Sequence, residues 1–431
     1  MIKLFPHQEA ALKATEGQNR VAYYLDMGLG KTFVGAEKAV KMGSNIILVV
    51  CQKSKVQDWV DHFRSNYEWI DDVVDLTNKK HFDLFTGLIG WTDFPPLYCC
   101  VAVINYDLIW RRKILQKLKN FTLILDESSL IQNQKSNRCK FILKMNPDNV
   151  VLLSGTPTGG KYENLWSQLH LLGWNISEKV YNAQYVNWKK INIGGMIHKI
   201  VDKEDPYRNV ERLKQKMREH GSVFMKTDEV FDLPEQNFIQ VKVPTTKEYR
   251  KFKRDQLVTV DGTEFVGDSI LSYRLYQRQL CSAYNPHKVQ AFRDLLESTQ
   301  DRLVVFYQFN CELVELQAAC NDLDRPCSIV NGSIKNLSSY EQESNSVTLV
   351  QYQAGAMGLN LQKANKIVYF SLTEEAELFE QSKKRIHRIG QERPCFYYLL
   401  ICENSIEDQE ILPTLNVRKE YNDQLFEGDG S

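Results

Sequence analysis

Short apolar runs alternate with amphipathic segments along the first third of the chain. Each run is continuously apolar, which is typical of strands in a parallel sheet that helices cover on both faces. The segments between the runs, such as 32–41 and 55–63, place apolar residues at helical spacing. This order predicts a doubly wound α/β layer. The expected strands are 20–26, 45–50, 100–105, 121–127 and 149–155.

The same alternation resumes after residue 285. Stretches with helical spacing predict helices, and the apolar runs between them predict the strands of a second sheet. The fold class that we expect is therefore α/β, with two parallel-sheet lobes in tandem and helical insertions. Helices are expected at 285–299 and 311–320, and strands at 302–308, 346–351, 365–371 and 395–401.

A chain of 431 residues exceeds the usual size of a single hydrophobic core. The region from about 173 to 284 matches neither sheet, and we interpret it as helical insertions. The last segment looks helical, with an interruption at Pro413. The predicted organisation is a first lobe at 1–240 with a helical insertion at about 174–232, a helical protrusion or linker at 241–285, a second lobe at 286–404 and a C-terminal helical segment at 405–431.

The first expected strand runs directly into the turn DMGLGKT. Gly28 and Gly30 allow backbone N–H groups to point at phosphate oxygens. Lys31 then reaches the terminal phosphates, and Thr32 offers a hydroxyl to Mg²⁺ at the start of the next helix. The full phosphate-loop template has a glycine where Leu25 stands, so a plain strand-to-helix turn is the alternative. The context of strand, glycine turn and helix favours a nucleotide.

Two carboxylates end a later strand of the same expected sheet. Asp126 and Glu127 lie at the carboxyl edge, where open α/β sheets place ligands. Asp126 can hold Mg²⁺, and Glu127 can polarise the attacking water. An acidic exit from strand to loop is the alternative, which the glycine turn on the same sheet makes weaker. The next strand ends in SGTP, residues 154–157, a stiff loop suited to relaying a change at the phosphate. Together these features predict an ATPase module.

Basic side chains are concentrated in QSKKRIHRIGQ, although the whole chain has as many Lys and Arg residues as Asp and Glu residues, 54 each. Three interpretations compete: a solvated helix face, a nucleic-acid patch, or charge for a phosphate bound elsewhere. On a helix, Arg385 and Arg388 project from one face, with Gln381 one turn earlier. An arginine from another lobe can accelerate phosphoryl transfer by about 10³–10⁵. The spacing alone leaves the three interpretations open, and Lys383 and Lys384 stay candidates for a nucleic-acid backbone.

Amino-acid composition indicates the class of protein and the compartment in which we expect it. Hydrophobic residues make up 43% of the chain and charged residues 25%, as in soluble globular proteins. Ten cysteines without a C-x-x-C pair indicate reduced thiols, so we expect the cytoplasm, or the nucleus in a eukaryote. The first residues lack the apolar core of a signal peptide, and no apolar stretch is long enough for a membrane span. Zero net charge argues against a generic polyanion binder and allows a local basic track.

Taken in order, these motifs resemble those of the Swi/Snf-type ATPases of helicase superfamily two, which are usually double-stranded DNA translocases. The resemblance covers nearly the whole chain, and its most specific part is the Arg-x-His-Arg-x-Gly-Gln core. The family's own phosphate loop also lacks the first glycine, which removes the difficulty at Leu25. The matching stretches are LFPHQ, DMGLGKT, VVCQKSKVQDWVDHF, VINYDLI, DESSLIQN, LLSGTPTGGKYENLWSQLHLL, FMKTDEVFDLPEQNFIQVKV, LVVFYQF, QYQAGAMGLNLQKANKIVYFS and QSKKRIHRIGQERPCFYYLL.

The resemblance implies two RecA-like lobes that use ATP and Mg²⁺. It implies that Gln8 recognises the adenine, and that Thr32 and Asp126 hold the metal. The catalytic residues that it implies are Lys31, Glu127, Arg385 and Arg388. The residues that it places around ATP are Gln8, Met27, Gly28, Leu29, Gly30, Lys31, Thr32, Asp126, Gly358, Arg385 and Arg388. The residues that it places on the DNA track are Lys53, Asn105, Tyr106 and Gln308.

Two departures from the family pattern affect these expectations. Ser128 and Ser129 replace the usual Ala-His after the carboxylates, so a histidine relay between ATP and DNA sites cannot work in the common way. Gln52 stands where the family generally has proline. Neither change removes a group that handles phosphate or metal. We therefore expect ATPase activity with altered coupling.

The sequence thus predicts a compact, monomeric, ATP-dependent translocase on double-stranded DNA, without accessory domains. It would remodel DNA or protein–DNA complexes, and protein partners would direct it to a substrate. A strand-separating DNA or RNA helicase would share every ATP residue and is the main alternative. A nucleotide-gated binding protein is a second alternative, against which intact Glu127, Arg385 and Arg388 argue. The nucleic acid that stimulates hydrolysis separates the translocase from the helicase.

Overall fold

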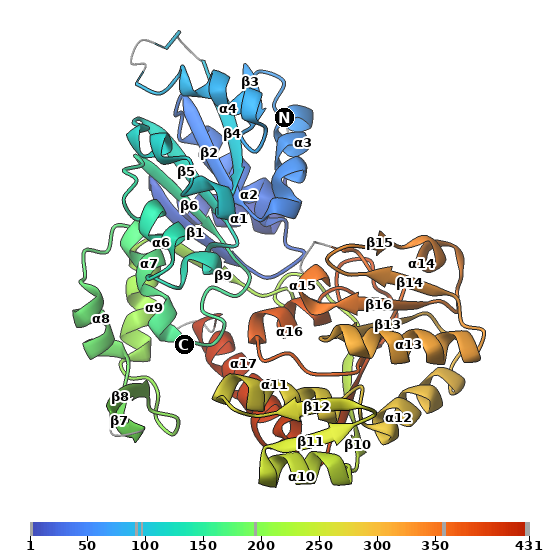
Figure 1. The fold of residues 1–431 in the computed structure, drawn as a ribbon. Helices are drawn as coiled ribbons and strands as arrows, with labels where there is room; N and C mark the ends of the chain where they lie inside the picture. Colours follow the sequence, from blue (N-terminus) through green and yellow to red (C-terminus); the bar gives the residue numbers. More distant parts are fainter. Residues whose placement is uncertain (1–2, 91–93, 96–97, 194–195, 356–358, 427–431) are drawn as a thin grey trace. The chain divides into compact units, whose positions relative to one another are not determined.

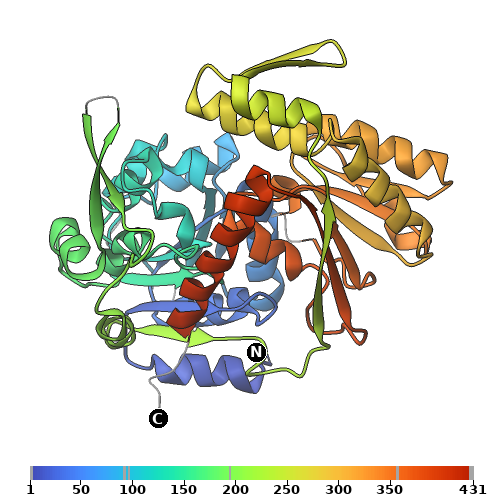
Figure 2. The ribbon, with the colours of Figure 1, turned by 90° about the horizontal axis from the view of Figure 1, so that it is seen from below.

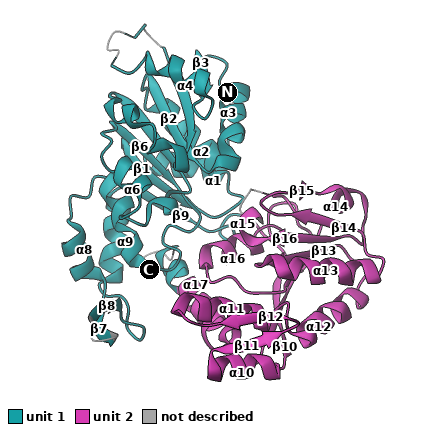
Figure 3. Ribbon diagram, in the orientation of Figure 1, with its two compact units in different colours: residues 1–230, 421–431 teal, residues 231–420 magenta. Residues whose placement is uncertain are grey.

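The computed structural model describes residues 3–90, 94–95, 98–193, 196–355 and 359–426. The chain divides into two compact units (Figure 3): unit 1 holds residues 1–230 and 421–431, and unit 2 holds residues 231–420. The division follows Val230, whereas the sequence suggested residue 240. The reason is β10 (Gln236–Val243), which pairs along its whole length with a strand of unit 2.

Seven parallel strands form the sheet of unit 1, in the order β3-β4-β2-β5-β6-β1-β9 (Figure 1). Strands β2 and β4 are buried along their whole length, which explains why their sequences are continuously apolar. Because all strands run the same way, their carboxyl ends meet at one edge. The strands are β1 (Arg20–Leu25), β2 (Ile46–Cys51), β3 (Asp72–Asp75), β4 (Cys100–Asn105), β5 (Phe121–Asp126), β6 (Asn149–Leu153) and β9 (Ser222–Met225).

The helices of unit 1 connect successive strands of this sheet, as the doubly wound pattern predicted. Four short 3₁₀ turns lie between them at η1 (Lys53–Lys55), η2 (Lys113–Lys117), η3 (Ser128–Ile131) and η4 (Tyr162–Asn164). The helices are α1 (Pro6–Ala14), α2 (Lys31–Lys41), α3 (Val56–Asn66), α4 (Lys79–Thr86), α5 (Tyr106–Ile109), α6 (Asn137–Ile142), α7 (Trp166–Leu171), α8 (Glu178–Tyr185) and α9 (Val210–Glu219).

The insertion expected at 174–232 is only partly helical. Between α8 and α9 lies an antiparallel hairpin of β7 (Trp188–Ile193) and β8 (Met196–Val201), which Figure 2 shows outside the central sheet. Strand β9 belongs to the same region but pairs with β1, so the interpretation that this region matches neither sheet is wrong there. With four residues, β9 is too short to give a clear pattern. The aromatic residues Tyr181 and Tyr185 are buried in the core.

Unit 2 contains a second sheet, ordered β10-β18-β17-β13-β16-β14-β15, in which only the β14–β15 pair is antiparallel. A separate hairpin consists of β11 (Leu257–Val260) and β12 (Thr263–Val266). The fold class is thus two tandem α/β sheets, as predicted. The strands of the second sheet are β10, β13 (Leu303–Tyr307), β14 (Cys327–Val330), β15 (Lys335–Asn336), β16 (Val347–Gln351), β17 (Lys366–Tyr369) and β18 (Cys395–Cys402).

Helices surround this sheet and continue to the end of the described chain. A π-helical turn, η5 (Glu407–Ile411), comes just before Pro413 and gives the proline ring room against the preceding carbonyls. Pro413 therefore lies in the first turn of a helix that continues to Phe426, and does not interrupt it. The helices are α10 (Lys247–Asp255), α11 (Ile270–Cys281), α12 (Pro286–Glu297), α13 (Asn310–Asp322), α14 (Ser338–Gln342), α15 (Tyr352–Gly355), α16 (Ala376–Lys383) and α17 (Leu412–Phe426).

The end of α17 belongs to unit 1. There the Tyr162 hydroxyl donates to the carbonyl oxygen of Tyr421 (2.8 Å), and the rings of Phe224 and Phe426 meet edge to face. The last turns of the chain therefore complete the core of unit 1. Among the described residues, no helix has the length and apolar character that crossing a membrane requires.

Candidate functional site

The turn between β1 and α2 depends on glycines with left-handed backbone. Gly28 has a φ of 91° and Gly30 a φ of 75°, and a Cβ at Gly30 would collide with Nε2 of Gln8. That nitrogen donates to the carbonyl oxygen of Leu29 (3.1 Å), and Oε1 of Gln8 accepts from the N–H of Phe5 (2.9 Å). Gln8 thus holds the turn against α1. These two hydrogen bonds use both Oε1 and Nε2 of Gln8, the atoms that we expected to recognise adenine.

Lys31 begins α2 and lies against the end of β1. Its Nζ donates to the carbonyl oxygens of Leu25 (3.0 Å) and Asp26 (3.3 Å). The Asp26 carboxylate in turn accepts from the hydroxyl of Thr227 (3.2 Å), which ties the turn to the segment after β9. A cation is therefore held beside a helix N-terminus, a combination that attracts anions such as phosphate.

Asp126 ends β5 and is oriented by an indole, because Nε1 of Trp59 donates to its Oδ2 (2.9 Å). Burial raises the pKa of Asp126, while the Trp59 hydrogen bond and the positive charges of Lys31 and Lys55 oppose that rise. The charge of Lys31 acts on Asp126, so the glycine turn and the carboxylate share one electrostatic environment. A phosphate-bound divalent cation needs both groups in that environment.

Glu127 follows in the left-handed conformation, with a φ of 52°. This conformation costs a residue with a side chain about 1–3 kcal/mol and persists only where the surroundings enforce it. The hydroxyl of Tyr106 donates to the carbonyl oxygen of Asp126 (3.0 Å), and the hydroxyl of Ser154 donates to Oε2 of Glu127 (3.4 Å). The two neighbouring carboxylates thus have different partners, which suits them to different roles.

The residues present fit a triphosphate with Mg²⁺. In the part of the chain that the structure describes, no group of three His, Cys, Asp or Glu side chains could hold a metal ion. Mg²⁺ commonly takes one or two carboxylates together with substrate phosphates and waters. Asp126 and the hydroxyl of Thr32, in the first turn of α2, are the residues that would supply such donors. The assignment of these two residues as metal ligands stays a prediction.

Arg385 and Arg388 lie in unit 2, beyond the end of α16 at Lys383. The expectation that they project from one face of a helix is therefore wrong. Residues far away in the sequence hold the end of this helix and the segment after it. The hydroxyl of Tyr397 donates to the carbonyl oxygen of Lys383 (3.2 Å), and the N–H of Leu361 donates to that of Arg385 (3.0 Å).

The two arginines have different surroundings. Arg385 is 3% exposed, and its Nη1 donates to the carbonyl oxygen of Leu359 (3.5 Å). Arg388 is half-buried, and burial lowers the pKa of its guanidinium group. Gly358, which we expected beside them, lies outside the described residues. Their proposed role toward phosphate stays a prediction.

Lys383 is not available to a DNA backbone, contrary to our expectation. Its side chain is buried, and Nζ lies 2.5 Å from Oε1 of Glu380. The ammonium group also lies over the rings of Phe238 and Phe379. Its charge is therefore already satisfied inside unit 2.

The four residues predicted on the DNA track differ in exposure. Lys53 is exposed on η1, at the start of the segment before α3. Asn105 and Tyr106 are buried, and the Tyr106 hydroxyl is bonded to the backbone of Asp126. Gln308 is partly buried, and its Oε1 has no hydrogen-bond partner among the described residues. In this structure Tyr106 therefore positions the carboxylate strand, and Lys53 is the accessible cation of the set.

Sequence reasoning missed Trp59, Thr227 and Gln168. Trp59 stands on α3 and Thr227 follows β9, so both reach the site from distant parts of the chain. Gln168 is a fully buried polar residue on α7, and it bonds to Ser128 and to the loop after β6. A glutamine at an otherwise apolar helix position was the one local signal for it.

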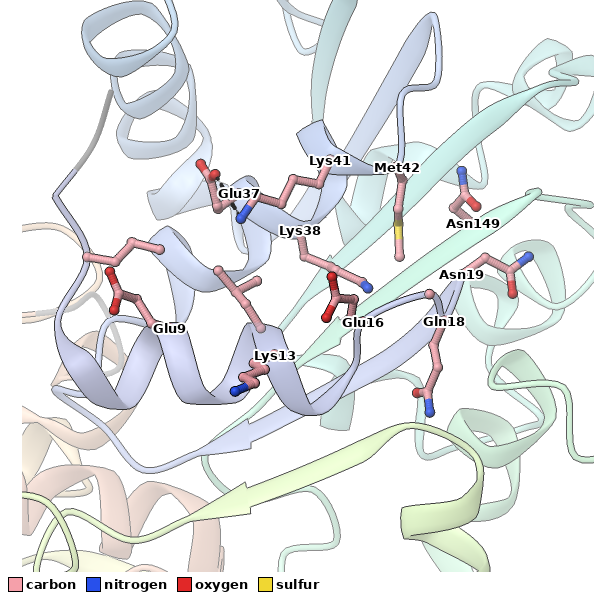
Figure 4. Close-up of a pocket in the computed structure, with 13 residues that line it drawn as sticks. Glu9, Lys13, Glu16, Gln18, Asn19, Glu37, Lys38, Lys41, Met42 and Asn149 are labelled. Atoms are coloured by element: carbon pink, nitrogen blue, oxygen red, sulfur yellow. Dashed lines mark ion pairs between the residues drawn. The ribbon is translucent and has the colours of Figure 1, made fainter.

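A cavity of about 770 Å³ lies elsewhere in unit 1 (Figure 4). Its lining comes from α1, α2 and the residues where β1 and β6 begin, including Asn19 and Asn149. These are the amino ends of the strands, whereas Asp126 lies at the carboxyl ends. Within the lining, Lys38 donates to the carbonyl oxygen of Thr15 (2.6 Å), and Lys41 lies 3.4 Å from Glu37. The cavity is therefore separate from the site described here.

Comparison with known families agrees with this geometry. Residues 24–285 match the SNF2-related domain, and residues 287–390 match the helicase conserved C-terminal domain. The chain belongs to the SNF2-related family. The two matches meet at residues 285 and 287, so the helicase C-terminal domain of this SNF2-related chain lies within unit 2.

Curated relatives of the SNF2-related chain include three of different origin. It is 23% identical to the ISWI chromatin-remodeling complex ATPase ISW1 of Saccharomyces cerevisiae, over 91% of this chain and 38% of that protein. It is 25% identical to the uncharacterized ATP-dependent helicase MG018 of Mycoplasma genitalium, over 89% of this chain and 38% of that protein. A third relative, from Caenorhabditis elegans, is 23% identical over 94% of this chain and 59% of that protein. It is named as a homolog of SWI/SNF-related matrix-associated actin-dependent regulator of chromatin subfamily A-like protein 1. The chain thus spans only part of the length of each relative.

A solved structure is also similar: the Sulfolobus solfataricus SWI2/SNF2 ATPase core in complex with dsDNA. It is 18% identical, with a TM-score of 0.45, and the similarity covers 99% of this chain and 94% of that one.

Proposed function

We propose that this chain is an ATP-dependent translocase on double-stranded DNA, which couples ATP hydrolysis to movement along the duplex and remodels DNA or protein–DNA complexes. One observation carries the proposal: Lys31 lies at the glycine turn after β1, and its charge acts on Asp126 at the end of β5 in the same parallel sheet. Membership of the SNF2-related family supports it, and relatives are named as a remodelling ATPase and as an ATP-dependent helicase.

In the proposed reaction, the backbone of the glycine turn and Lys31 bind the phosphates. Asp126 and Thr32 would hold Mg²⁺, which when bound would supply positive charge to the phosphate oxygens. Glu127 accepts a proton from the attacking water as general base. Arg385 and Arg388 stabilise the negative charge that spreads over the transferred phosphoryl group. Alternate binding of the duplex by the two units then converts turnover into steps.

The test measures ATP turnover without nucleic acid and with duplex DNA, single-stranded DNA or RNA at equal nucleotide concentration. We expect duplex DNA to stimulate turnover most. A second assay uses a DNA triplex, in which a third strand is bound to a duplex. A translocase moving along the duplex displaces the third strand and leaves the duplex paired, so release of that strand is measured. Displacement is expected with ATP and is expected to be absent in a Lys31→Ala control.

Two results would contradict the proposal. Separation of an ordinary duplex, with stronger stimulation by single strands or RNA, would indicate a strand-separating helicase instead. Turnover that no nucleic acid changes would remove the DNA-motor interpretation altogether.

A further inference from the structure

A buried hydrogen-bond chain joins the carboxylate segment of unit 1 to the loop after β6. Gln168, Ser128 and Tyr24 are all 0% exposed. Oε1 of Gln168 accepts from the hydroxyls of Ser128 (2.7 Å) and Tyr24 (3.1 Å), and Nε2 donates to the carbonyl oxygen of Pro157 (2.7 Å). One side chain on α7 therefore contacts three other segments of unit 1.

Chemistry fixes the direction of these hydrogen bonds. The carbonyl of Pro157 can only accept, so the amide nitrogen of Gln168 faces it and the amide oxygen faces the two hydroxyls. Ser128 and Tyr24 therefore both donate. Burial raises the pKa of Tyr24 well above its usual value, so its hydroxyl keeps the proton. Because an unpaired polar group at a buried position is costly, Gln168 and Ser128 are expected to move together.

Both ends of the loop at 154–157 are connected to the segment that holds Glu127 and Ser128. The hydroxyl of Ser154 donates to Oε2 of Glu127 (3.4 Å) and accepts from the N–H of Thr156 (3.1 Å). At the other end, Pro157 is connected through Gln168 to Ser128, which directly follows Glu127. A change in the position of Glu127 therefore acts on the loop by two routes.

The loop also has features of an element with a second arrangement. Oγ1 of Thr156 is buried and has no hydrogen-bond partner among the described residues. A different loop position that gives this hydroxyl a partner would recover the free energy that its burial costs. Beyond the loop, Gly159 and Gly160 have φ values of 55° and 75°, and glycine rotates between such conformations easily.

We propose that Gln168 is a positioning residue that passes changes at Glu127 and Ser128 to the loop at 154–157, and so couples ATP hydrolysis to DNA binding. It takes over the task of the histidine relay that Ser128 and Ser129 cannot perform. This inference rests on the proposed function, because coupling presupposes hydrolysis that DNA stimulates.

The experiment compares Gln168→Met, Ser128→Ala and Tyr24→Phe with the unmutated chain. Gln168→Met keeps the shape of the side chain and removes both hydrogen-bonding atoms, and Ser128→Ala breaks the same path at its other end. Tyr24→Phe is the matched control, because it removes a hydroxyl from the same Oε1 and leaves the path from Ser128 to Pro157 intact. The kcat and KM for ATP are measured with and without saturating duplex DNA, together with the thermal unfolding midpoint.

We expect the ratio of DNA-stimulated to basal kcat to fall by at least about fivefold in Gln168→Met and in Ser128→Ala. The KM for ATP is expected to change little, and Tyr24→Phe is expected to keep the full ratio. Because both substitutions break one path, the double variant is expected to lose no more than either single variant.

Full stimulation in Gln168→Met or Ser128→Ala, at a temperature well below both unfolding midpoints, would overturn the inference. An equal loss in Tyr24→Phe would overturn it too, because packing would then explain all three results. If DNA fails to stimulate the unmutated chain, the proposed function itself fails, and that result is visible before any variant is compared.

Discussion

The two units share a seven-stranded architecture but treat their buried charges differently. In unit 1, the indole N–H of Trp59 donates to Asp126, and the hydroxyl of Ser154 donates to Glu127. In unit 2, Lys288 and Glu407 form an ion pair whose side chains are 0% and 2% exposed, with 2.6 Å between Nζ and Oε2. Glu407 also accepts from the N–H of Cys402 (3.1 Å).

This difference is the one that we expect between a carboxylate proposed to act in the chemistry and a carboxylate that holds the fold. A carboxylate with neutral partners is oriented and can still bind a cation or accept a proton, whereas a paired carboxylate is already neutralised. Glu312 of unit 2 differs from both cases, because it accepts from the N–H groups of Gln308 (2.7 Å) and Phe309 (3.0 Å) and caps the start of α13. Neutral partners alone therefore do not mark a carboxylate that is kept for chemistry. One architecture thus carries the proposed reactive strand edge in unit 1 and a structural ion pair in unit 2.

The largest expected effect tests the two residues of unit 2 that we propose act in the chemistry. Arg385→Ala and Arg388→Ala are each expected to lower kcat for ATP by about 10³-fold or more, equivalent to about 4 kcal/mol in the barrier. The control is Arg393→Ala, an exposed arginine that donates to the carbonyl oxygen of Lys363 (2.8 Å). Steady-state turnover close to that of the unmutated chain in both variants would contradict their role.

The next effect concerns stability. Lys288→Met leaves the buried charge of Glu407 unpaired, so we expect it to lower the free energy of unfolding of unit 2 by about 3–5 kcal/mol. Lys214→Met in unit 1 is the matched control, because its partner Glu211 is 72% exposed and water can replace the lysine. Its expected effect is about 0–1 kcal/mol. Urea unfolding of both variants measures the difference, and equal losses would contradict the contrast.

The smallest effect is a pH dependence in unit 1. His62 packs against Phe33, with ring centroids 4.8 Å apart, and burial lowers the pKa of His62 to about 4. In the unfolded chain the pKa is about 6.5, so between these values the unfolded state binds more protons. The stabilisation is therefore present above pH 6.5 and is lost as the pH falls toward 4.

With allowance for the partial exposure of His62, we expect a loss of about 1–2 kcal/mol over that range. The measurement follows the unfolding midpoint from pH 7 to pH 4.5 in the unmutated chain and in His62→Phe. The decline is expected to be shallower in the variant, and identical slopes would show that His62 is not the titrating group.

The central strands of both units could be predicted from the sequence, because continuous burial on two faces leaves a continuous apolar run. Strands β3, β9 and β15 could not be predicted. They are short and lie at sheet edges, where a strand has a neighbour on one side only and need not be buried along its length. β10 is polar at half of its positions and exposed at most of them, and it belongs to the sheet through its pairing with β18. Because of that pairing, the boundary between the units follows Val230 and not residue 240, the boundary that the sequence suggested.

The candidate site shows the same division. The glycine turn and the carboxylate pair are local patterns, so the sequence showed them. Trp59, Thr227 and Gln168 come from other segments and act through contacts that only the fold creates. The helix expected through Arg388 ends at Lys383, and Tyr397 and Leu361, which are distant in the sequence, donate to the carbonyl oxygens of Lys383 and Arg385.

The most direct test of the account measures ATP binding and steady-state turnover in Glu127→Gln. If the strand edge of unit 1 holds the nucleotide and Glu127 is the general base, the variant binds ATP as the unmutated chain does, and its turnover falls by about 10²–10⁴-fold. Turnover at the unmutated rate, or loss of ATP binding in a variant that remains folded, would contradict the account.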